Sequence, residues 1–189
     1  MENRRGPRER IVLSAVRHLR VHGADGMALR AVVADAEAPW GSFAHYFPGG
    51  KDQLLTEAIE WSGRYAVRQV GDYLARARRP DPSGLADAVV QWWITDLERG
   101  GVAAGCPVAG AVADGHHAGR VGAACRVALT DWQDAVRLAL RDMDVPPGRA
   151  RELATLVIAA LEGALVLARA DGSTEPLRVV RRQLRRLLG

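Results

Sequence analysis

Several residue types and patterns are scarce in this 189-residue sequence, and each absence narrows the possible classes of protein. Cysteine occurs only twice, which is too few for the disulfide framework of a small secreted domain. The N-terminal residues contain no apolar core of the kind found in signal peptides. Alternating apolar and polar runs typical of strands do not stand out. We therefore expect an all-α protein located in the cytoplasm.

The spacings that carry enzymatic or metal chemistry are also missing. No nucleophile–base pair or carboxylate pair can be recognised. His116 and His117 are adjacent, so they point apart on a helix, and no His-x3-His or paired-cysteine spacing accompanies them. Cys106 is a candidate redox sensor, although a lone thiol is usually a packing residue unless its pKa is lowered. We expect no enzyme activity, no cofactor and no metal site.

Charge is distributed unevenly along a chain of ordinary globular composition, 48% apolar and 25% charged. Residues 1–51 carry eight basic against five acidic side chains, residues 52–175 carry thirteen against seventeen, and residues 176–189 carry five against none. A basic head attached to an acidic middle is typical of a nucleic-acid-binding domain joined to a sensor. Arg4, Arg5 and Arg8 form a basic arm that is either a solvated terminus or an added phosphate contact.

The stretch 29–51 predicts two short helices joined by a tight turn. Leu29, Val32, Val33 and Ala36 share one helical face, and Pro39 interrupts that pattern. A second short helix is expected over 40–47, before Pro-Gly-Gly at 48–50. Such a pair is the helix-turn-helix arrangement, whose second helix enters the DNA major groove. A preceding helix is expected over 8–22, with Arg10, Arg17 and Arg20 left for solvent or phosphate.

Residues 10–55 resemble the DNA-binding domain of the TetR family of bacterial repressors. The matching pieces are Arg10-Ile11-Val12, Gly23-Ala24-Asp25-Gly26, Leu29-Arg30-Ala31-Val32, Gly41-Ser42-Phe43, His45-Tyr46-Phe47 and Pro48-Gly49-Gly50-Lys51 with Leu54-Leu55. The Pro-Gly-Gly-Lys form and Gly105-Cys106-Pro107-Val108-Ala109 are similar to the LmrA-like branch. The resemblance implies a three-helix DNA-binding domain at 1–50, joined by a long helix to a ligand-binding and dimerisation domain at 51–189.

We expect the DNA-facing side chains to lie in and beside the helix-turn-helix. Ser42 can bond to base edges or backbone, and Arg30 can reach a phosphate. Lys51 lies at a helix N-terminus, where backbone N–H groups favour an anion. Trp40 either contacts a sugar or a thymine methyl, or packs under the turn. The expected set is Arg30, Trp40, Gly41, Ser42, His45, Tyr46 and Lys51.

Four positions depart from what the resemblance implies. The family usually has Thr at Ala28, Gly at Glu37, a basic or small polar residue at Trp40, and Tyr at Ala44. Thr and Tyr at the first and last of these positions contact phosphate in the family. A carboxylate at Glu37 adds negative charge near a polyanion. The alternative function is therefore a TetR-like helical dimer that has lost DNA binding and binds a small molecule or a protein.

Beyond residue 50 the pattern predicts a chain of helices. Ser83 is the expected N-cap of the second of them. The stretch 100–120 is rich in small residues and is either the mobile element of a ligand switch or a connector. The expected helices cover 51–79, 84–98, a short segment beginning at Cys106-Pro107, 118–144, 149–170 and 176–188.

Two further sets of residues follow from these helices. Aromatic and apolar side chains of the middle region are candidates for a ligand pocket: Trp61, Tyr65, Trp92, Trp93, Trp132 and Met143. The span 153–168 is apolar nearly all round but too short, with Glu162 at its centre, for a membrane span. By resemblance the last two helices dimerise, through Leu156, Ala160, Gly163, Ala164, Leu167, Val180 and Leu184. The basic amphipathic segment 176–188 could instead lie on a membrane.

These expectations combine into one function. The sequence predicts a homodimeric repressor that binds a palindromic DNA operator and is released by a small apolar effector. A two-fold dimer would present two recognition helices to half-sites about one helical turn, or 34 Å, apart. No membrane partner is expected.

Overall fold

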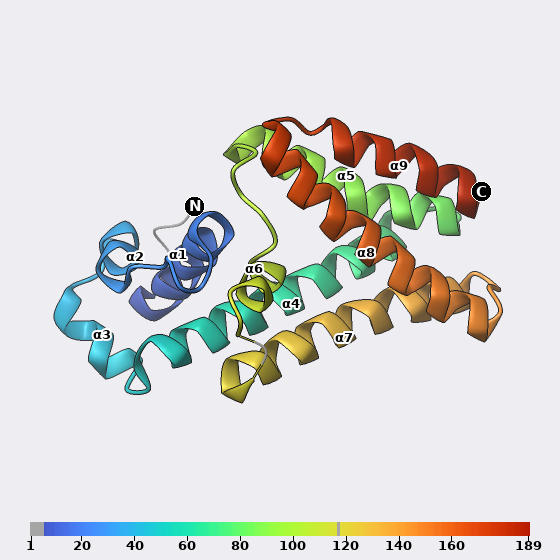
Figure 1. The fold of residues 1–189 in the computed structure, drawn as a ribbon. Coiled ribbons are helices and arrows are strands. Elements are labelled where there is room, and N and C mark those ends of the chain that lie inside the picture. Colours follow the sequence, from blue (N-terminus) through green and yellow to red (C-terminus); the bar gives the residue numbers. More distant parts are fainter. Residues whose placement is uncertain (1–5, 117) are drawn as a thin grey trace. The chain divides into compact units, whose positions relative to one another are not determined.

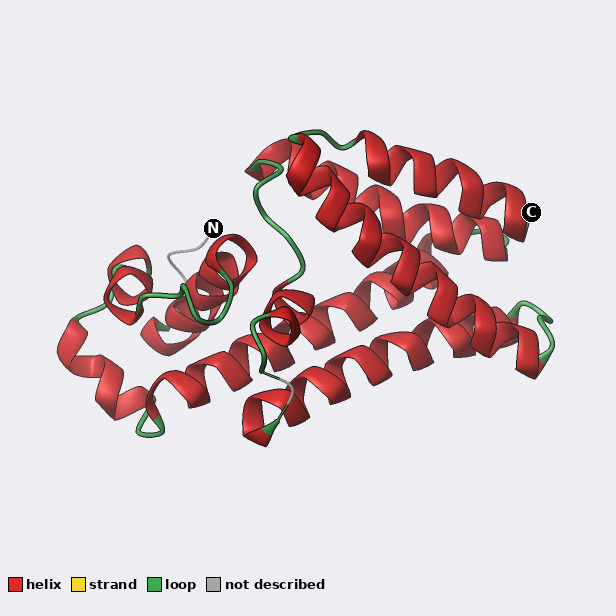
Figure 2. Ribbon diagram, viewed as in Figure 1, coloured by secondary structure: helices red, strands yellow, loops and turns green. Residues whose placement is uncertain are grey.

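A computed structural model describes residues 6–116 and 118–189. Every regular element of these residues is a helix, so the predicted all-α class is confirmed (Figures 1 and 2). The basic residues Arg4 and Arg5 and the second histidine, His117, lie outside the described residues. In chain order the helices are α1 (Pro7–His22), α2 (Leu29–Asp35), α3 (Trp40–Tyr46), α4 (Gly50–Arg76), α5 (Pro82–Gly100), α6 (Pro107–Ala113), α7 (Gly119–Asp142), α8 (Pro147–Asp171) and α9 (Glu175–Leu188).

Helix starts in this chain often use proline, whose missing N–H costs nothing in the first turn. Prolines stand in the first turn of α1, α5, α6, α8 and α9. At α5 the cap is Asp81, not the predicted Ser83. Asp81 Oδ1 accepts hydrogen bonds from the Gly84 N–H (2.9 Å) and the Ser83 hydroxyl (2.7 Å). These two hydrogen bonds, with Gly84 contributing most, lower the pKa of Asp81.

The chain divides into two compact units, each with its own core. The first contains the described residues through Gly63 together with Cys106–Ala128. Here α1 packs on α2 and α6, and α2 packs on α3. Gly63 of α4 lies so close to α7 that an added Cβ would be 2.7 Å from the Ala128 Cβ. The fully or nearly fully buried side chains of this unit include Ile11, Leu19, Val32, Phe47, Leu54, Leu55 and Ile59.

The second unit contains Arg64–Gly105 and Leu129–Gly189. Helix α9 packs along α5 and on α8. Arg181 of α9 holds Asp87 of α5 with two hydrogen bonds, Nε to Oδ1 (2.7 Å) and Nη2 to Oδ2 (2.9 Å). The Tyr73 hydroxyl bonds to both the N–H and the C=O of Asp81, each at 3.1 Å, and so fixes the connection from α4 to α5. The core includes Leu85, Ile94, Leu97, Leu140, Leu161 and Leu177.

Helix α8 is the one described helix that is long and apolar enough to cross a membrane by length and composition. It has 25 residues. The apolar span 153–168 is thus part of a longer helix, and the length of that helix does not by itself exclude a membrane span. Because 44% of its most apolar stretch is buried inside the protein, and α8 packs on α9, the pattern is equally that of a core helix.

Candidate nucleic-acid interface and sensor residues

The turn between α2 and α3 is held by backbone hydrogen bonds and by Arg10 of α1. Glu37 adopts a left-handed conformation with φ of 48°, which costs a residue with a Cβ about 1–2 kcal/mol. Arg10 Nε donates to the Ala36 carbonyl (2.9 Å), and its Nη2 donates to the Glu37 carbonyl (3.0 Å). The expectation that Arg10 is left for solvent or phosphate is therefore wrong. The arginine stabilises the turn that orients α3.

Asp35, the last residue of α2, ties that helix to α1. Its Oδ2 lies 2.7 Å from the Ser14 hydroxyl and 2.8 Å from Arg17 Nη2, so Arg17 is also engaged within the protein. Burial alone would raise the pKa of Asp35, but the hydrogen bonds from Ser14 and Arg17 outweigh it and the pKa is lowered. Burial lowers the pKa of neighbouring His18, although Asp35 opposes that shift. The α1–α2 pairing therefore depends on charge as well as on packing.

Trp40, the first residue of α3, presents its indole to solvent with 46% of the residue exposed. The ring stacks on Phe43, with centroids 5.5 Å apart and planes 6° apart. The Arg30 guanidinium lies over the same ring, 5.1 Å from its centroid. The Ser42 hydroxyl donates to the Pro39 carbonyl (2.6 Å) and so closes the first turn of α3. The geometry brings Arg30 and Trp40 together and engages Ser42 locally.

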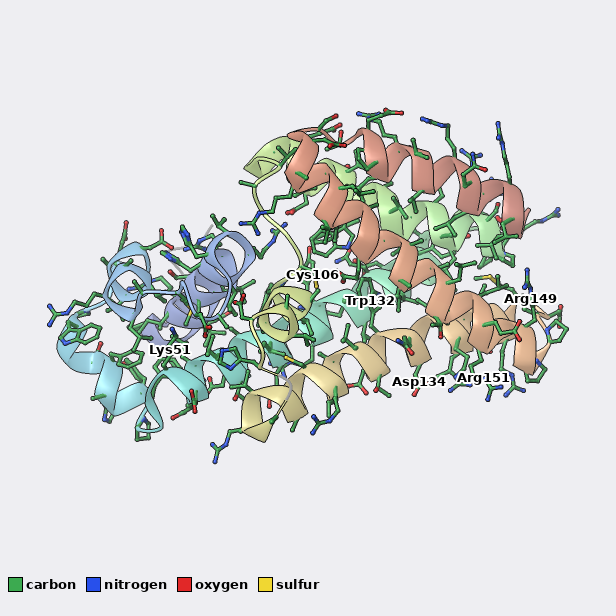
Figure 3. All side chains as sticks on the ribbon, viewed as in Figure 1. Lys51, Cys106, Trp132, Asp134, Arg149 and Arg151 are labelled. Atoms are coloured by element: carbon green, nitrogen blue, oxygen red, sulfur yellow. The ribbon has the colours of Figure 1, made fainter. Side chains whose placement is uncertain are left out.

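The remaining predicted DNA-facing residues differ in how much surface they offer. Gly41 and His45 are exposed and Tyr46 is half-buried, with the His45 and Tyr46 rings 5.2 Å apart, edge to face. Lys51 (Figure 3) makes a hydrogen bond within the protein. Its Nζ donates to the Asp25 carbonyl (3.2 Å) in the connection between α1 and α2. At the same helix start the Gly49 N–H donates to the Gln53 side chain (2.9 Å). This helix N-terminus thus satisfies part of its donors internally.

The segment after α6 contacts the connection between α1 and α2. Asp114 Oδ2 accepts from the Ala24 N–H (2.6 Å), and His116 Nε2 lies 2.9 Å from Asp25 Oδ1. A Cβ at Gly23 would come within 2.3 Å of Asp114 Oδ2, so glycine is required for this approach as well as for its φ of 71°. Sequence reasoning missed Asp114. No local pattern indicates a partner about 90 residues away.

The candidate ligand-binding aromatics fall into separate groups. The structure brings Tyr65, Trp92 and Trp93 together: the Tyr65–Trp92 centroids are 5.3 Å apart and the Trp92–Trp93 centroids are 4.8 Å apart. Trp132 is buried on α7 (Figure 3), and Met143 lies in the turn that follows α7. Trp61 belongs to the first compact unit, whereas the other candidates belong to the second.

The predicted dimer residues also separate by exposure. On α8 Leu156 and Leu167 are 43% and 56% exposed, and Gly163 is exposed. Ala164 and Leu184 are buried within the chain's own core, and Ala160 and Val180 are half-buried. A row along α8 that remains accessible instead comprises Leu156, Ala159, Gly163, Val166, Leu167 and Ala170. We call it the α8 row. Val179 and Leu187 are the exposed apolar side chains of α9.

The two cysteines are buried and do not form a disulfide. Cys106 is the N-cap residue of α6, and burial raises the pKa of the Cys125 thiol, which keeps it protonated. In the part of the chain that the structure describes, no group of three His, Cys, Asp or Glu side chains is placed to hold a metal ion.

Comparison with known proteins agrees with this geometry. The family model for the C-terminal domain of LmrA/YxaF-like transcriptional regulators matches residues 82–183. The chain is 36% identical to an uncharacterized HTH-type transcriptional regulator of Mycobacterium tuberculosis, covering 97% of this chain and 94% of that protein. It is 29% identical to the HTH-type transcriptional regulator LmrA of Bacillus subtilis, with 90% of each chain covered.

Solved structures show the same fold at lower identity. A TetR transcriptional regulator from Legionella pneumophila superposes with a TM-score of 0.87 at 16% identity and covers 98% of both chains. The regulatory protein TetR from Rhodobacter sphaeroides gives a TM-score of 0.83 at 21% identity, covering 94% of this chain and 96% of that one. The N-terminal helix-turn-helix, the C-terminal family match and the relatives at nearly full length agree: the chain belongs to the TetR family of transcriptional regulators, in its LmrA/YxaF-like branch.

Proposed function

We propose that this protein is a homodimeric, ligand-responsive repressor that binds a palindromic DNA operator. The observation that carries the proposal is the exposed face of α3, which is oriented by a turn that Arg10 holds. A recognition helix has to be held in a fixed orientation, and these two hydrogen bonds hold the turn that precedes α3. The relatives matched over nearly the whole chain are named as transcriptional regulators, and we propose no enzyme activity and a cytoplasmic location.

Two of the four departures support the alternative function, a helical dimer without DNA binding. Ala28 stands at the N-cap of α2 and offers no side-chain cap. Ala44 is exposed on α3 and offers no polar group to a phosphate. Glu37, in contrast, is accommodated in the turn, and Trp40 is presented to solvent. DNA binding in our proposal therefore relies on Arg30, Trp40, His45 and Tyr46 more than on hydroxyl contacts to phosphate.

The proposed dimer surface consists of the α8 row with Val179 and Leu187 of α9. Exposed apolar side chains on two neighbouring helices mark a protein interface when they form a contiguous patch. Gly163 and the alanines of the row permit close approach of a second α8. We leave Ala164 and Leu184 out of this surface because they pack within the chain. A two-fold axis between two copies would pair the row with itself.

We propose that the effector is a small apolar molecule and that Tyr65, Trp92 and Trp93 are its first candidate contacts. These three rings already meet within the second unit, and Arg68 lies over the Tyr65 ring at 5.4 Å. A ligand lowers operator affinity only by its differential affinity for the free and the DNA-bound states. Functionally, we divide the chain into a DNA-binding part at 1–50 and a ligand-binding and dimerisation part at 51–189.

Binding of the purified full chain to labelled DNA from its own upstream region tests the proposal, in moderate salt with excess non-specific competitor. We expect saturable binding at nanomolar protein that survives the competitor. Binding that disappears with competitor would contradict the repressor function and favour the alternative. If binding is found, a panel of apolar compounds should include at least one that releases the DNA, and Trp92→Ala should weaken that release without weakening DNA binding.

A further inference from the structure

An exposed tryptophan at the start of a DNA-reading helix is an unusual surface feature. Trp40 is the only Trp among the exposed large apolar side chains of the described residues. Its neighbours Phe43 and Arg30 both contact the ring and so restrict its rotamers. A side chain that is exposed and yet held in place can contact a partner without first losing much conformational entropy.

The chemistry of the first turn of α3 is mainly apolar. Indole has one N–H donor and no acceptor, so most of the exposed Trp40 surface can make only apolar contacts. Gly41 has no side chain, and Ser42 donates its hydroxyl proton to the Pro39 carbonyl. In a helix-turn-helix the N-terminal residues of the second helix contact base edges. The residues expected to meet the bases first therefore offer the apolar part of the indole that Phe43 and Arg30 leave exposed, and little polar chemistry.

Only one group on the major-groove edge of DNA matches such a surface. The C5-methyl of thymine is apolar, whereas the other groups at that edge are hydrogen-bond donors and acceptors. We propose that Trp40 reads the C5-methyl group of one thymine in each operator half-site. The inference rests on the proposed DNA-binding function and specifies what that function recognises.

Arg30 supports this reading as a positioning residue. Within residues 6–116 and 118–189 its guanidinium has no hydrogen-bond or ion-pair partner, and it lies over the Trp40 ring. A cation over an indole is attracted by the ring's quadrupole and leaves the guanidinium N–H groups free to donate at its edge. A DNA phosphate that accepts a hydrogen bond from Arg30 would hold the indole against the groove. The negative charge of that phosphate complements the positive charge of the arginine.

The test begins with selection of binding sites by the full-length protein from random double-stranded DNA. Each thymine of the selected site is then replaced singly by deoxyuridine, which removes only the methyl group, and the dissociation constant is measured by fluorescence anisotropy. We expect one thymine per half-site whose replacement weakens binding about fourfold, the effect of one buried methyl-sized group. The other thymines should show smaller effects.

Variants identify the side chain responsible. Trp40→Ala should bind the thymine site more weakly and become indifferent to deoxyuridine at that position. Arg30→Ala should reduce the deoxyuridine penalty, because the ring loses its support. His45→Ala is the matched control on the same helix, and it should keep the full penalty even if overall affinity falls. Circular dichroism and thermal unfolding check that each variant is folded.

The outcomes distinguish DNA binding in general from recognition of the thymine methyl group. Failure to select any sequence would contradict the DNA-binding function itself. Selective binding in which no thymine is sensitive to deoxyuridine, or in which Trp40→Ala keeps the same penalty, would overturn the thymine reading and leave the DNA-binding function standing. Loss of the penalty in Trp40→Ala, with its retention in His45→Ala, would establish it.

Discussion

The N-terminal head, which comprises α1 to α3 and the connections between them, and the C-terminal helices α8 and α9 are stabilised by different kinds of contact. In the head, polar contacts between residues far apart in sequence fix the backbone: Arg10 to the α2–α3 turn, and Asp114 to the α1–α2 connection. In α8 and α9, arginine–aspartate pairing ties α9 to α5, while an apolar row on α8 stays exposed. The head is therefore held together by contacts within one chain, whereas the exposed row on α8 is the surface that we propose a second copy covers.

The largest expected effect comes from putting a charge into the exposed apolar row. Leu167→Glu should weaken the dimer by at least about 100-fold, because a buried unpaired carboxylate costs several kcal/mol and the symmetry places it twice in the interface. Sedimentation or light scattering should show a monomer at micromolar protein. Leu138→Glu is the matched control, since Leu138 is equally apolar and 50% exposed but lies on α7. An unchanged dimer in Leu167→Glu would show that α8 is not the interface.

The stability of the N-terminal head should fall when one of its polar contacts is removed. Arg10→Ala should lower the free energy of unfolding by about 1–3 kcal/mol, since the Ala36 and Glu37 carbonyls lose a charged donor. Thermal or urea unfolding measures the loss. Arg120→Ala, an exposed arginine at the start of α7, should change stability by no more than about 0.5 kcal/mol. Equal effects of the two substitutions would mean that the turn does not depend on Arg10.

Lowering the pH should destabilise the N-terminal head through two titrating groups, the imidazole of His18 and the carboxylate of Asp35. The folded pKa of His18 lies below its ordinary 6.5, so the unfolded state takes up a proton first and stability falls as the pH drops below that value. The folded pKa of Asp35 lies below its ordinary 3.8, so its contribution is present above that value and is lost as the pH falls through the lowered pKa.

Urea midpoints across this pH range test both contributions. His18→Gln should flatten the upper part of the curve and Asp35→Asn the lower part. Because Asp35 also acts on His18, the aspartate variant should additionally change the upper part slightly. A pH dependence that neither variant changes would place the acid-sensitive groups elsewhere.

The smallest effect is expected from substitution of Glu37 in the turn between α2 and α3. Glu37→Gly should stabilise the protein by up to about 1 kcal/mol, because glycine adopts a φ of 48° without the cost of a Cβ. It should also raise DNA affinity by removing a negative charge near the phosphates. Glu37→Ala separates the two causes, since it removes the charge but keeps the Cβ, and should raise affinity without raising stability. A gain in stability with alanine would contradict the conformational explanation.

Local patterns were enough to predict the helices, because periodicity and proline act within a few residues of each helix. The N-cap at α5 was wrongly predicted as Ser83, although Asp81 directly before Pro82 is a cap residue followed by a first-turn proline. The contacts of Arg10, Lys51 and Asp114 were not predictable. Each joins residues at least 26 positions apart and depends on tertiary packing.

Prediction of the proposed dimer surface on α8 was limited in the same way. Because α8 is apolar nearly all round, the sequence could not separate the side that faces its own core from the side left for a partner. Ala164 and Leu167 are only three residues apart, yet one is buried and the other is 56% exposed. Only the tertiary packing of α8 distinguishes them.

Whether two DNA-binding heads act as a pair is tested by comparing two DNA molecules of equal length, one with the complete selected palindrome and one with a single half-site scrambled. The full chain should bind the palindrome at least about 100-fold more tightly, because two heads held by one dimer engage it together. Equal affinity for the two molecules would contradict the account, since it would mean that the heads do not act as a pair.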